Sequence, residues 1–309
     1  MKIFGPVPSR RLGQSLGINN VRAKTCSYAC IYCQLGRTKK MQLKREKFYN
    51  LDEVKHKLEK TLNELEKKGE KVDYFTFVAD GEPTLDKNLG KTIKAIKKYD
   101  IKIAVISNSS LIYKKEVRDE LMEADWVSLK CDAVSEEVWK KVDRTFGKLN
   151  LCDIKEGMKK FSSEFNGKFV TETMLVKGIN DSKNELKKIA NFIAELDTDC
   201  SYVAIPTRPP AEKEVNGPEP EKINMAVQLF KKKGINTEYL IGYEGNQFSS
   251  TGDIEKDILN ITSVHPLKEE AVEELIHKCN SSWEEVKRLI NEEKIVKIEF
   301  NNENYYMRN

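Results

Sequence analysis

The sequence predicts an α/β protein built as a partial (βα)6 TIM-like barrel with a C-terminal winged-helix-like module. Helical and strand patterns alternate at βα spacing from residue 51 to about residue 250, and six segments have the composition of buried parallel strands. Beyond residue 250 the pattern changes to short helices followed by a hairpin. We therefore expect one domain over residues 1–250 and a second over residues 251–309.

Each predicted strand of the larger domain is a short apolar run that ends at a polar or glycine-containing cluster. The runs cover residues 15–21, 72–78, 101–107, 126–131, 168–176 and 201–206. Helical periodicity covers residues 51–65, 88–99, 114–124, 135–143, 153–165 and 182–196. Six βα units are too few to close an eight-stranded barrel, so we expect an open sheet with reactive groups at the carboxyl ends of its strands. A run rich in proline and charge at residues 208–221 predicts a surface loop over that face.

The smaller domain has the pattern of three helices and a hairpin, which is typical of a winged helix. The helices are expected at residues 253–261, 266–279 and 283–293, and the hairpin strands at 295–300 and 304–308. Ser282 and Glu285 have the spacing of a capping box at the start of the third helix. That helix carries four glutamates against Lys287 and Arg288, so it would repel phosphate if it served as a recognition helix. Docking of a protein, or bracing of the barrel, are the alternative roles.

The composition is that of a globular protein, with 39% apolar and 33% charged residues in a chain of 309. No window holds the roughly 20 apolar residues that cross a bilayer. The first 13 residues contain two prolines and two arginines where an export signal would need an apolar core. We therefore expect a cytoplasmic protein with no membrane partner. In such a reducing compartment, seven cysteines indicate thiolate chemistry or metal ligation before disulfides.

Positive charge is concentrated at the start of the chain. Residues 1–50 contain 11 Lys and Arg residues and one acidic residue, whereas the rest of the chain contains 42 basic and 48 acidic residues. A focused positive field of this kind favours a polyanionic substrate. A solvated, lysine-rich surface is the alternative interpretation.

Three of the seven cysteines, Cys26, Cys30 and Cys33, lie within eight residues. Three thiolates in one short loop can hold three corners of a 4Fe–4S cluster and leave the fourth iron open to another ligand. Zinc, or a purely structural cluster, is the alternative. Zinc would need a fourth ligand, and no histidine or second cysteine pair stands at a suitable spacing.

The Cys-x3-Cys-x2-Cys spacing, with aromatic Tyr32 before the last cysteine, resembles the hallmark of the radical S-adenosylmethionine (SAM) superfamily. Gly81-Glu82-Pro83 resembles that superfamily's Gly-Gly-Glu-Pro motif, with Asp80 in place of the first glycine. The resemblance covers residues 1 to about 245. It implies a 4Fe–4S cluster on the three cysteines, SAM as the second cofactor, Tyr32 near the adenine, and Gly81, Glu82 and Pro83 at the methionine amino group. A solvated surface acid is the alternative reading of Glu82.

Four more residues are expected at the cofactor. Ser107 and Asn108 resemble the polar pair that ends the third strand of these enzymes and contacts the methionine carboxylate or the ribose. Lys130 and Asp132 share one face of the fourth strand by alternation, so Lys130 could meet the carboxylate and Asp132 a ribose hydroxyl. An internal Lys–Asp pair without a ligand is the alternative. Arg144 and Arg208 are further candidate anion contacts for the substrate, with surface arginines as the alternative.

The resemblance implies an enzyme that cleaves SAM reductively to a 5′-deoxyadenosyl radical, which abstracts hydrogen from a substrate. Such chemistry needs a low-potential electron donor of the flavodoxin or ferredoxin type. The motifs are most similar to a group of uncharacterised iron–sulfur oxidoreductases related to wyosine-type tRNA-modifying enzymes, which makes RNA one candidate substrate. A protein, peptide or small metabolite is the second candidate. A third hypothesis is an iron–sulfur DNA-binding regulator without radical chemistry.

Overall fold

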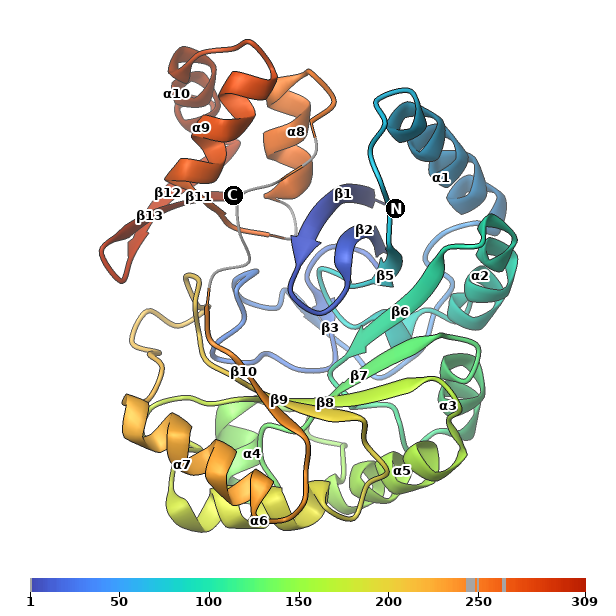
Figure 1. The fold of residues 1–309 in the computed structure, drawn as a ribbon, viewed down its shortest axis with the longest axis vertical. Coiled ribbons are helices and arrows are strands. Elements are labelled where there is room, and N and C mark those ends of the chain that lie inside the picture. The colour runs from blue at the N-terminus through green and yellow to red at the C-terminus, as the bar shows by residue number, and fades with distance from the viewer. Residues whose placement is uncertain (1, 243–247, 249, 263–264) are drawn as a thin grey trace.

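The computed structural model describes residues 2–242, 248, 250–262 and 265–309, and its centre is a curved, mostly parallel eight-stranded sheet (Figure 1). In spatial order the strands are β1 (Lys2–Ser9), β2 (Gly13–Asn19), β5 (Tyr74–Phe77), β6 (Lys102–Ser107), β7 (Trp126–Lys130), β8 (Lys168–Met174), β9 (Cys200–Ala204) and β10 (Thr237–Leu240). Strand β1 is antiparallel to β2, and the other neighbours are parallel. Because β1 and β10 end this order without pairing to each other, the sheet is open.

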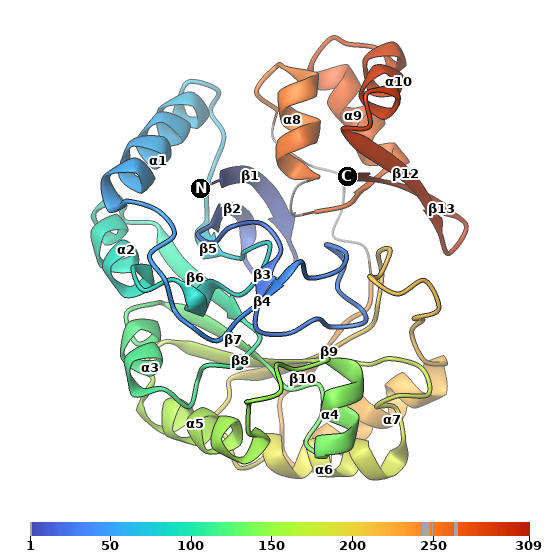
Figure 2. The same ribbon diagram turned by 180° about the vertical axis from the view of Figure 1, so that it is seen from behind.

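Helices form an outer arc around the sheet, as both views show (Figures 1 and 2). They are α1 (Leu51–Glu66), α2 (Leu89–Ile96), α3 (Lys115–Leu121), α4 (Glu136–Val142), α5 (Leu151–Glu164), α6 (Lys183–Ile193) and α7 (Pro220–Lys231). Helix α1 shows how the sequence sets an element. Asn50 caps its first turn by accepting from the Asp52 N–H, its apolar stripe is buried, and Gly69 takes a left-handed φ of 68° just beyond its end.

The six predicted strands correspond to β2 and β5–β9, and the α/β class with a mostly parallel sheet is confirmed. The prediction missed β1, β10 and α7. Strand β1 contains Gly5, Pro6 and Pro8, which lower strand propensity, so its extended form depends on pairing with β2. The count of six strands is therefore corrected to seven parallel strands and one antiparallel strand.

The C-terminal residues form three helices and a small antiparallel sheet, as the pattern predicted. These are α8 (Ile254–Ile261), β11 (Leu267–Lys268), α9 (Glu269–Lys278), α10 (Trp283–Asn291), β12 (Ile295–Phe300) and β13 (Glu303–Arg308). The predicted capping box is wrong. Within the described residues the Ser282 side chain makes no capping hydrogen bond, and the Glu285 carboxylate accepts from Arg288 instead.

The C-terminal elements contact the sheet at two places. Phe4 and Val7 of β1 belong to the same buried apolar cluster as Ile258 of α8. The Tyr305 hydroxyl donates to the carbonyl of Thr207, which follows β9, over 2.9 Å. These elements therefore brace one edge strand and a loop near the other edge. None of the helices in the described part of the chain is long and apolar enough to cross a bilayer.

Candidate functional site

A cavity of about 280 Å³ opens where the parallel strands β2, β5, β6 and β7 end. Nine of the eleven predicted site residues line it. They are Cys26, Cys30, Tyr32, Cys33, Gly81, Glu82, Ser107, Asn108 and Lys130. Parallel strands bring their carboxyl ends to one edge of a sheet, and this brings together residues that lie up to 104 positions apart in the chain.

Backbone hydrogen bonds hold the cysteine loop in place. Cys26 ends the short strand β3 (Thr25–Cys26), which pairs with β4 (Lys40–Met41). The Ile31 N–H donates to the carbonyl of Val142 and the Cys33 N–H to the carbonyl of Cys30, over 3.0 and 3.1 Å. The three thiols are half-buried and line the same cavity, whereas none of the other described cysteines lines it.

The donor set of the loop fits an iron–sulfur cluster better than a single metal ion. Among the described residues, no three His, Cys, Asp or Glu side chains converge as ligands of one ion. In a 4Fe–4S cluster each thiolate binds a different iron, so the three sulfurs need not converge. Burial raises the pKa of all three thiols, that of Cys26 to about 12, because a thiolate is unstable in this cavity without a nearby cation. Iron would supply that positive charge.

Glu82 presents a buried carboxylate to the cavity. Only 1% of the residue is exposed, which rules out the alternative of a solvated surface acid. Its carboxylate accepts from the Thr84 N–H and hydroxyl, the Ser107 hydroxyl and the Asn108 N–H, over 2.6 to 3.0 Å. Burial raises the pKa of Glu82, and these hydrogen bonds oppose the rise. Ser107 and Asn108 therefore orient Glu82 as well as lining the cavity.

Gly81 is required by a close backbone approach. It has a φ of 150°, and a Cβ atom there would lie 1.9 Å from the carbonyl oxygen of Thr25. The turn thus packs directly on the residue before Cys26, and the Glu82 N–H donates to the same carbonyl. Asp80 is not among the residues with positive φ, so the backbone tolerates its side chain. It forms an ion pair with Lys24 at 3.2 Å.

A buried charge network forms one wall of the cavity. The Glu172 carboxylate of β8 pairs with Lys130 at 2.9 Å and with Arg11 at 2.5 Å. Arg11 extends from the β1–β2 turn, and its guanidinium lies 5.5 Å from the ring centroids of Trp126 and Tyr202. Burial alone would raise the pKa of Glu172, but Lys130 and Arg11 lower it to about 2.

Arg11 and Glu172 were not predicted as site residues. The sequence did contain a signal for Glu172, because a charged residue in the middle of a predicted parallel strand is buried and must find a partner. It contained no comparable signal for Arg11, which reaches its partner across 161 residues of chain.

Asp132 and Pro83 do not line the cavity. The Tyr32 hydroxyl donates to the fully buried Asp132 carboxylate, which also accepts from the Met174 N–H. Asp132 therefore orients Tyr32 and lies behind it. The Asp132 carboxylate also lies 3.7 Å from the Lys130 ammonium group, so the two side chains are paired as alternation along the strand predicted. Pro83 is buried at the start of a 3-10 turn (Pro83–Leu85) and shapes the backbone after Glu82.

The proline-rich segment 208–221 packs more closely than a surface loop. Arg208 lines the cavity, donates to Gln34 over 2.8 Å and contacts His265 of the C-terminal elements. The N–H of Glu212, a buried residue, donates to the carbonyl of Ile31 in the cysteine loop. The segment is thus a loop beside the cavity, as expected, with an exposed part and a part anchored on the cysteine loop.

The model of the radical SAM superfamily matches residues 21–193, which include the cysteine loop, Glu82, Lys130 and Glu172. The chain belongs to the radical SAM superfamily. Radical SAM proteins are enzymes that use a 4Fe–4S cluster and SAM, and these are the cofactors of this chain. The residues of the cavity fit both cofactors by donor chemistry, three thiols for iron and a buried carboxylate for an ammonium group.

Three relatives illustrate the relationship. A UPF0026 protein of Methanocaldococcus jannaschii is 43% identical over 308 residues, covering 99% of this chain and 95% of that protein. A protein of Endomicrobium trichonymphae named "Probable dual-specificity RNA methyltransferase RlmN" is 26% identical over 220 residues, 68% of this chain and 60% of that protein. The crystal structure of a radical SAM methyltransferase from Sphaerobacter thermophilus superposes with a TM-score of 0.54 at 15% identity, covering 74% of this chain and 66% of that chain. This last likeness concerns the fold alone.

We predict that Glu82→Gln weakens SAM binding to the radical SAM enzyme about 10- to 100-fold, because a hydrogen bond to a charged partner contributes about 1.5 to 3 kcal/mol. The amide would also turn a donor toward the N–H groups that Glu82 now accepts from. Isothermal titration of SAM into the anaerobically reconstituted protein measures the effect, with iron content unchanged.

The matched control is Glu185→Gln. Glu185 is also buried and accepts from the Val134 and Ser135 N–H groups, but it does not line the cavity. Glu185→Gln should lower the free energy of unfolding by about as much as Glu82→Gln does. Its affinity for SAM should equal that of the wild type. Equal affinity in Glu82→Gln and wild type would show that Glu82 does not contact the cofactor.

Proposed function

We propose that Cys26, Cys30 and Cys33 hold the 4Fe–4S cluster, that SAM occupies the rest of the cavity, and that the enzyme abstracts hydrogen from an RNA substrate. The observation that carries this proposal is the convergence of three thiols and one buried carboxylate on a single cavity. When bound and reduced, the cluster supplies the electron that cleaves SAM to methionine and the 5′-deoxyadenosyl radical.

The residues of the chain bind and orient the cofactor. The Glu82 carboxylate accepts from the methionine ammonium group, and Gly81 allows the close backbone approach that places it there. Ser107 and Asn108 hold Glu82 and present polar groups to the methionine carboxylate or the ribose. Lys130 offers an ammonium group to that carboxylate.

Two further residues act by shaping the site. Asp132 holds Tyr32 by accepting from its hydroxyl. The Tyr32 ring would then be positioned to contact the adenine of bound SAM. Pro83 sets the turn after Glu82. A flavodoxin- or ferredoxin-type donor delivers the electron, since radical SAM chemistry needs a low-potential reductant.

We further propose the domain division at residues 250 and 251 and a winged-helix-like architecture for the C-terminal domain. Its supports are an apolar cluster distinct from the main core, made mostly of C-terminal residues together with Phe4 and Val7 of β1, and the order helix, strand, helix, helix, strand, strand. Helix α10 is unsuited to binding phosphate groups. Arg288 is already paired with Glu255, Glu285 and Glu292 at 2.6 to 2.9 Å. We assign this domain a bracing role in the barrel.

Two observations favour RNA as the substrate. Residues 1–50 carry an excess of ten positive charges over negative ones, a distribution that attracts a polyanion. The Endomicrobium trichonymphae relative is named as an RNA methyltransferase and aligns with 68% of this chain. A protein, peptide or metabolite substrate would require neither feature.

The proposed function is tested by anaerobic reconstitution with SAM and dithionite, followed by addition of a cellular RNA pool or, separately, a metabolite extract. We expect RNA to raise the rate of 5′-deoxyadenosine formation at least tenfold above the rate without substrate. Stimulation by the metabolite extract alone would contradict the RNA assignment. Absence of 5′-deoxyadenosine under all conditions would contradict radical chemistry and favour the regulator hypothesis.

A further inference from the structure

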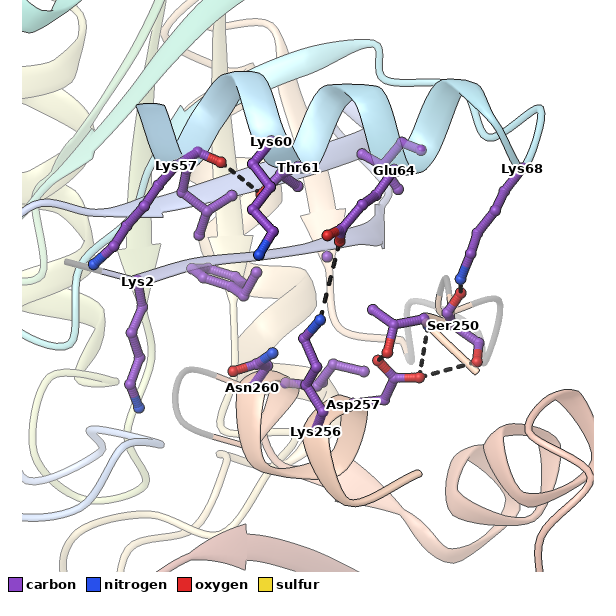
Figure 3. A pocket seen from close by; sticks show the side chains of 16 residues that line it. Lys2, Lys57, Lys60, Thr61, Glu64, Lys68, Ser250, Lys256, Asp257 and Asn260 are labelled. Atoms are coloured by element: carbon purple, nitrogen blue, oxygen red, sulfur yellow. Dashed lines mark hydrogen bonds and ion pairs between the residues drawn. The ribbon is translucent and has the colours of Figure 1, made fainter. Parts of the chain in front are cut away.

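A second, larger hollow lies outside the catalytic cavity, between α1, β1 and α8 (Figure 3). It has a volume of about 330 Å³ and is lined by five lysines from three segments of the chain, Lys2, Lys57, Lys60, Lys68 and Lys256. We call it the lysine groove. Figure 3 shows Lys60 extending from α1 toward α8 and Lys256 extending from α8 toward α1.

The charge of the lysine groove is only partly balanced by its own acids. Two acidic residues line it, Glu64 and Asp257. Asp257 is engaged by the hydroxyl of Ser250 and by the N–H and hydroxyl of Thr251, over 2.6 to 2.9 Å. Glu64 makes a single long ion pair with Lys256 at 4.0 Å. Lys57 is paired with Glu53, outside the groove, at 2.8 Å. The lining therefore keeps a surplus of two positive charges.

Two of the groove lysines, Lys60 and Lys2, lack full compensation of their positive charge. Lys60 forms no ion pair within the part of the chain that the structure describes, although it lines the groove. Lys2 is half-buried, and burial followed by the positive charge of Arg308 lowers its pKa. Asp80 opposes this effect, but less strongly than burial and Arg308 produce it. An anion in the groove would offset both the cost of burying the Lys2 ammonium group and its repulsion by Arg308.

The lysine groove opens at the same end of the sheet as the catalytic cavity. Lys2 of β1 pairs with Asn19, the last residue of β2, and the cysteine loop follows β2. Asp80, which influences Lys2, is paired with Lys24 and directly precedes Gly81 of the cavity lining. A chain-like ligand lying in the groove could therefore extend toward the site of chemistry.

We propose that the lysine groove binds the phosphodiester backbone of the RNA substrate. This inference rests on the proposed function and names where that substrate is held. Lysine ammonium groups on separate elements suit phosphates spaced along a strand, because each is a compact point charge that does not require paired geometry. Helix α8 provides one wall of the groove, so the C-terminal domain contributes to RNA binding through α8, and not through the acidic helix α10.

The test compares RNA binding by the wild-type holoenzyme, Lys2→Gln/Lys60→Gln and the control Lys91→Gln/Lys148→Gln. Lys91 and Lys148 are exposed, lie outside the groove and form no ion pair within the described ranges. Fluorescence anisotropy with a labelled single-stranded RNA, measured across a salt series, gives the affinity and its salt dependence. In the Lys2/Lys60 variant, we expect the slope of log K against log salt to become shallower by about 0.7 for each lysine replaced. The control should keep the wild-type slope.

A turnover assay separates failure of the groove from failure of the RNA assignment. With the RNA pool as substrate, the Lys2/Lys60 variant should raise KM for RNA and leave kcat for 5′-deoxyadenosine within twofold of wild type, because neither lysine lines the catalytic cavity. If this variant binds RNA with wild-type affinity and slope while RNA still stimulates turnover, the proposal that the lysine groove binds RNA is wrong. The proposed function is then unaffected. Equal losses in the control would also overturn the groove proposal. Wild-type protein that binds no RNA at low salt would overturn both.

Discussion

Replacing Cys30 with alanine is expected to abolish both cluster binding and 5′-deoxyadenosine formation. The three thiols lie in one loop on one cavity, and none of the other described cysteines lines that cavity, where it could replace a lost ligand. A cluster left with two thiolates loses a protein bond to one of its irons. Cys26→Ala and Cys33→Ala should behave in the same way. Iron analysis after anaerobic reconstitution and chromatographic detection of 5′-deoxyadenosine measure the two losses.

The control for these variants is Cys152→Ala. Cys152 is exposed on α5 and does not line the cavity, so its loss should leave iron content and turnover as in wild type. A Cys30→Ala protein that still holds four irons would mean that the cluster is bound elsewhere. Retained iron in the triple alanine variant would remove the basis of the proposed function.

Glu172→Ala is expected to lower the free energy of unfolding by about 3 to 5 kcal/mol, the usual cost of leaving a buried charge without its partner. Glu172 joins Lys130 and Arg11, and the side chains of all three are 10 to 13% exposed. Removal of the carboxylate leaves the buried Arg11 without this ion-pair partner and leaves Lys130 with only its longer pair to Asp132 at 3.7 Å. Urea unfolding of the apoprotein, followed by circular dichroism, measures the change.

Glu195→Gln is the comparison for Glu172→Ala. Glu195 pairs with Lys159 on the surface, where an ion pair contributes about 0 to 1 kcal/mol. A loss in Glu172→Ala no larger than in this control would mean that water or a conformational change relieves the charge of Arg11 and Lys130.

The pH dependence of stability checks the same network. The pKa of Glu172 falls from its ordinary 4.5 to about 2 in the folded protein. The folded state therefore favours the ionised form, and the stabilisation, about 3 kcal/mol, is present above pH 4.5. It is lost as the pH falls from 4.5 through 2. Glu172→Ala should lack this part of the acid dependence, and wild-type acid sensitivity in the variant would contradict the assignment.

The sequence by itself determined the parts of this protein that depend on local spacing. The cysteine loop needs only eight consecutive residues, and the turn after β5 needs only Gly81, Glu82 and Pro83. Short apolar runs located β2 and β5–β9, because burial on both faces of a parallel strand favours a continuous apolar run. From these came the expected position of the site at the carboxyl ends of the strands.

The contacts between residues far apart in the chain could not be predicted from local patterns. Arg11 reaches Glu172 because the β1–β2 turn directs it inward, Asp132 meets Tyr32 after β7 has ended, and the lysine groove joins Lys2 to α1 and α8. No periodicity or motif spacing in the sequence predicts any of these contacts. Each depends on how the sheet curves and on where the C-terminal domain docks, which are set by the packing of segments far apart in the chain.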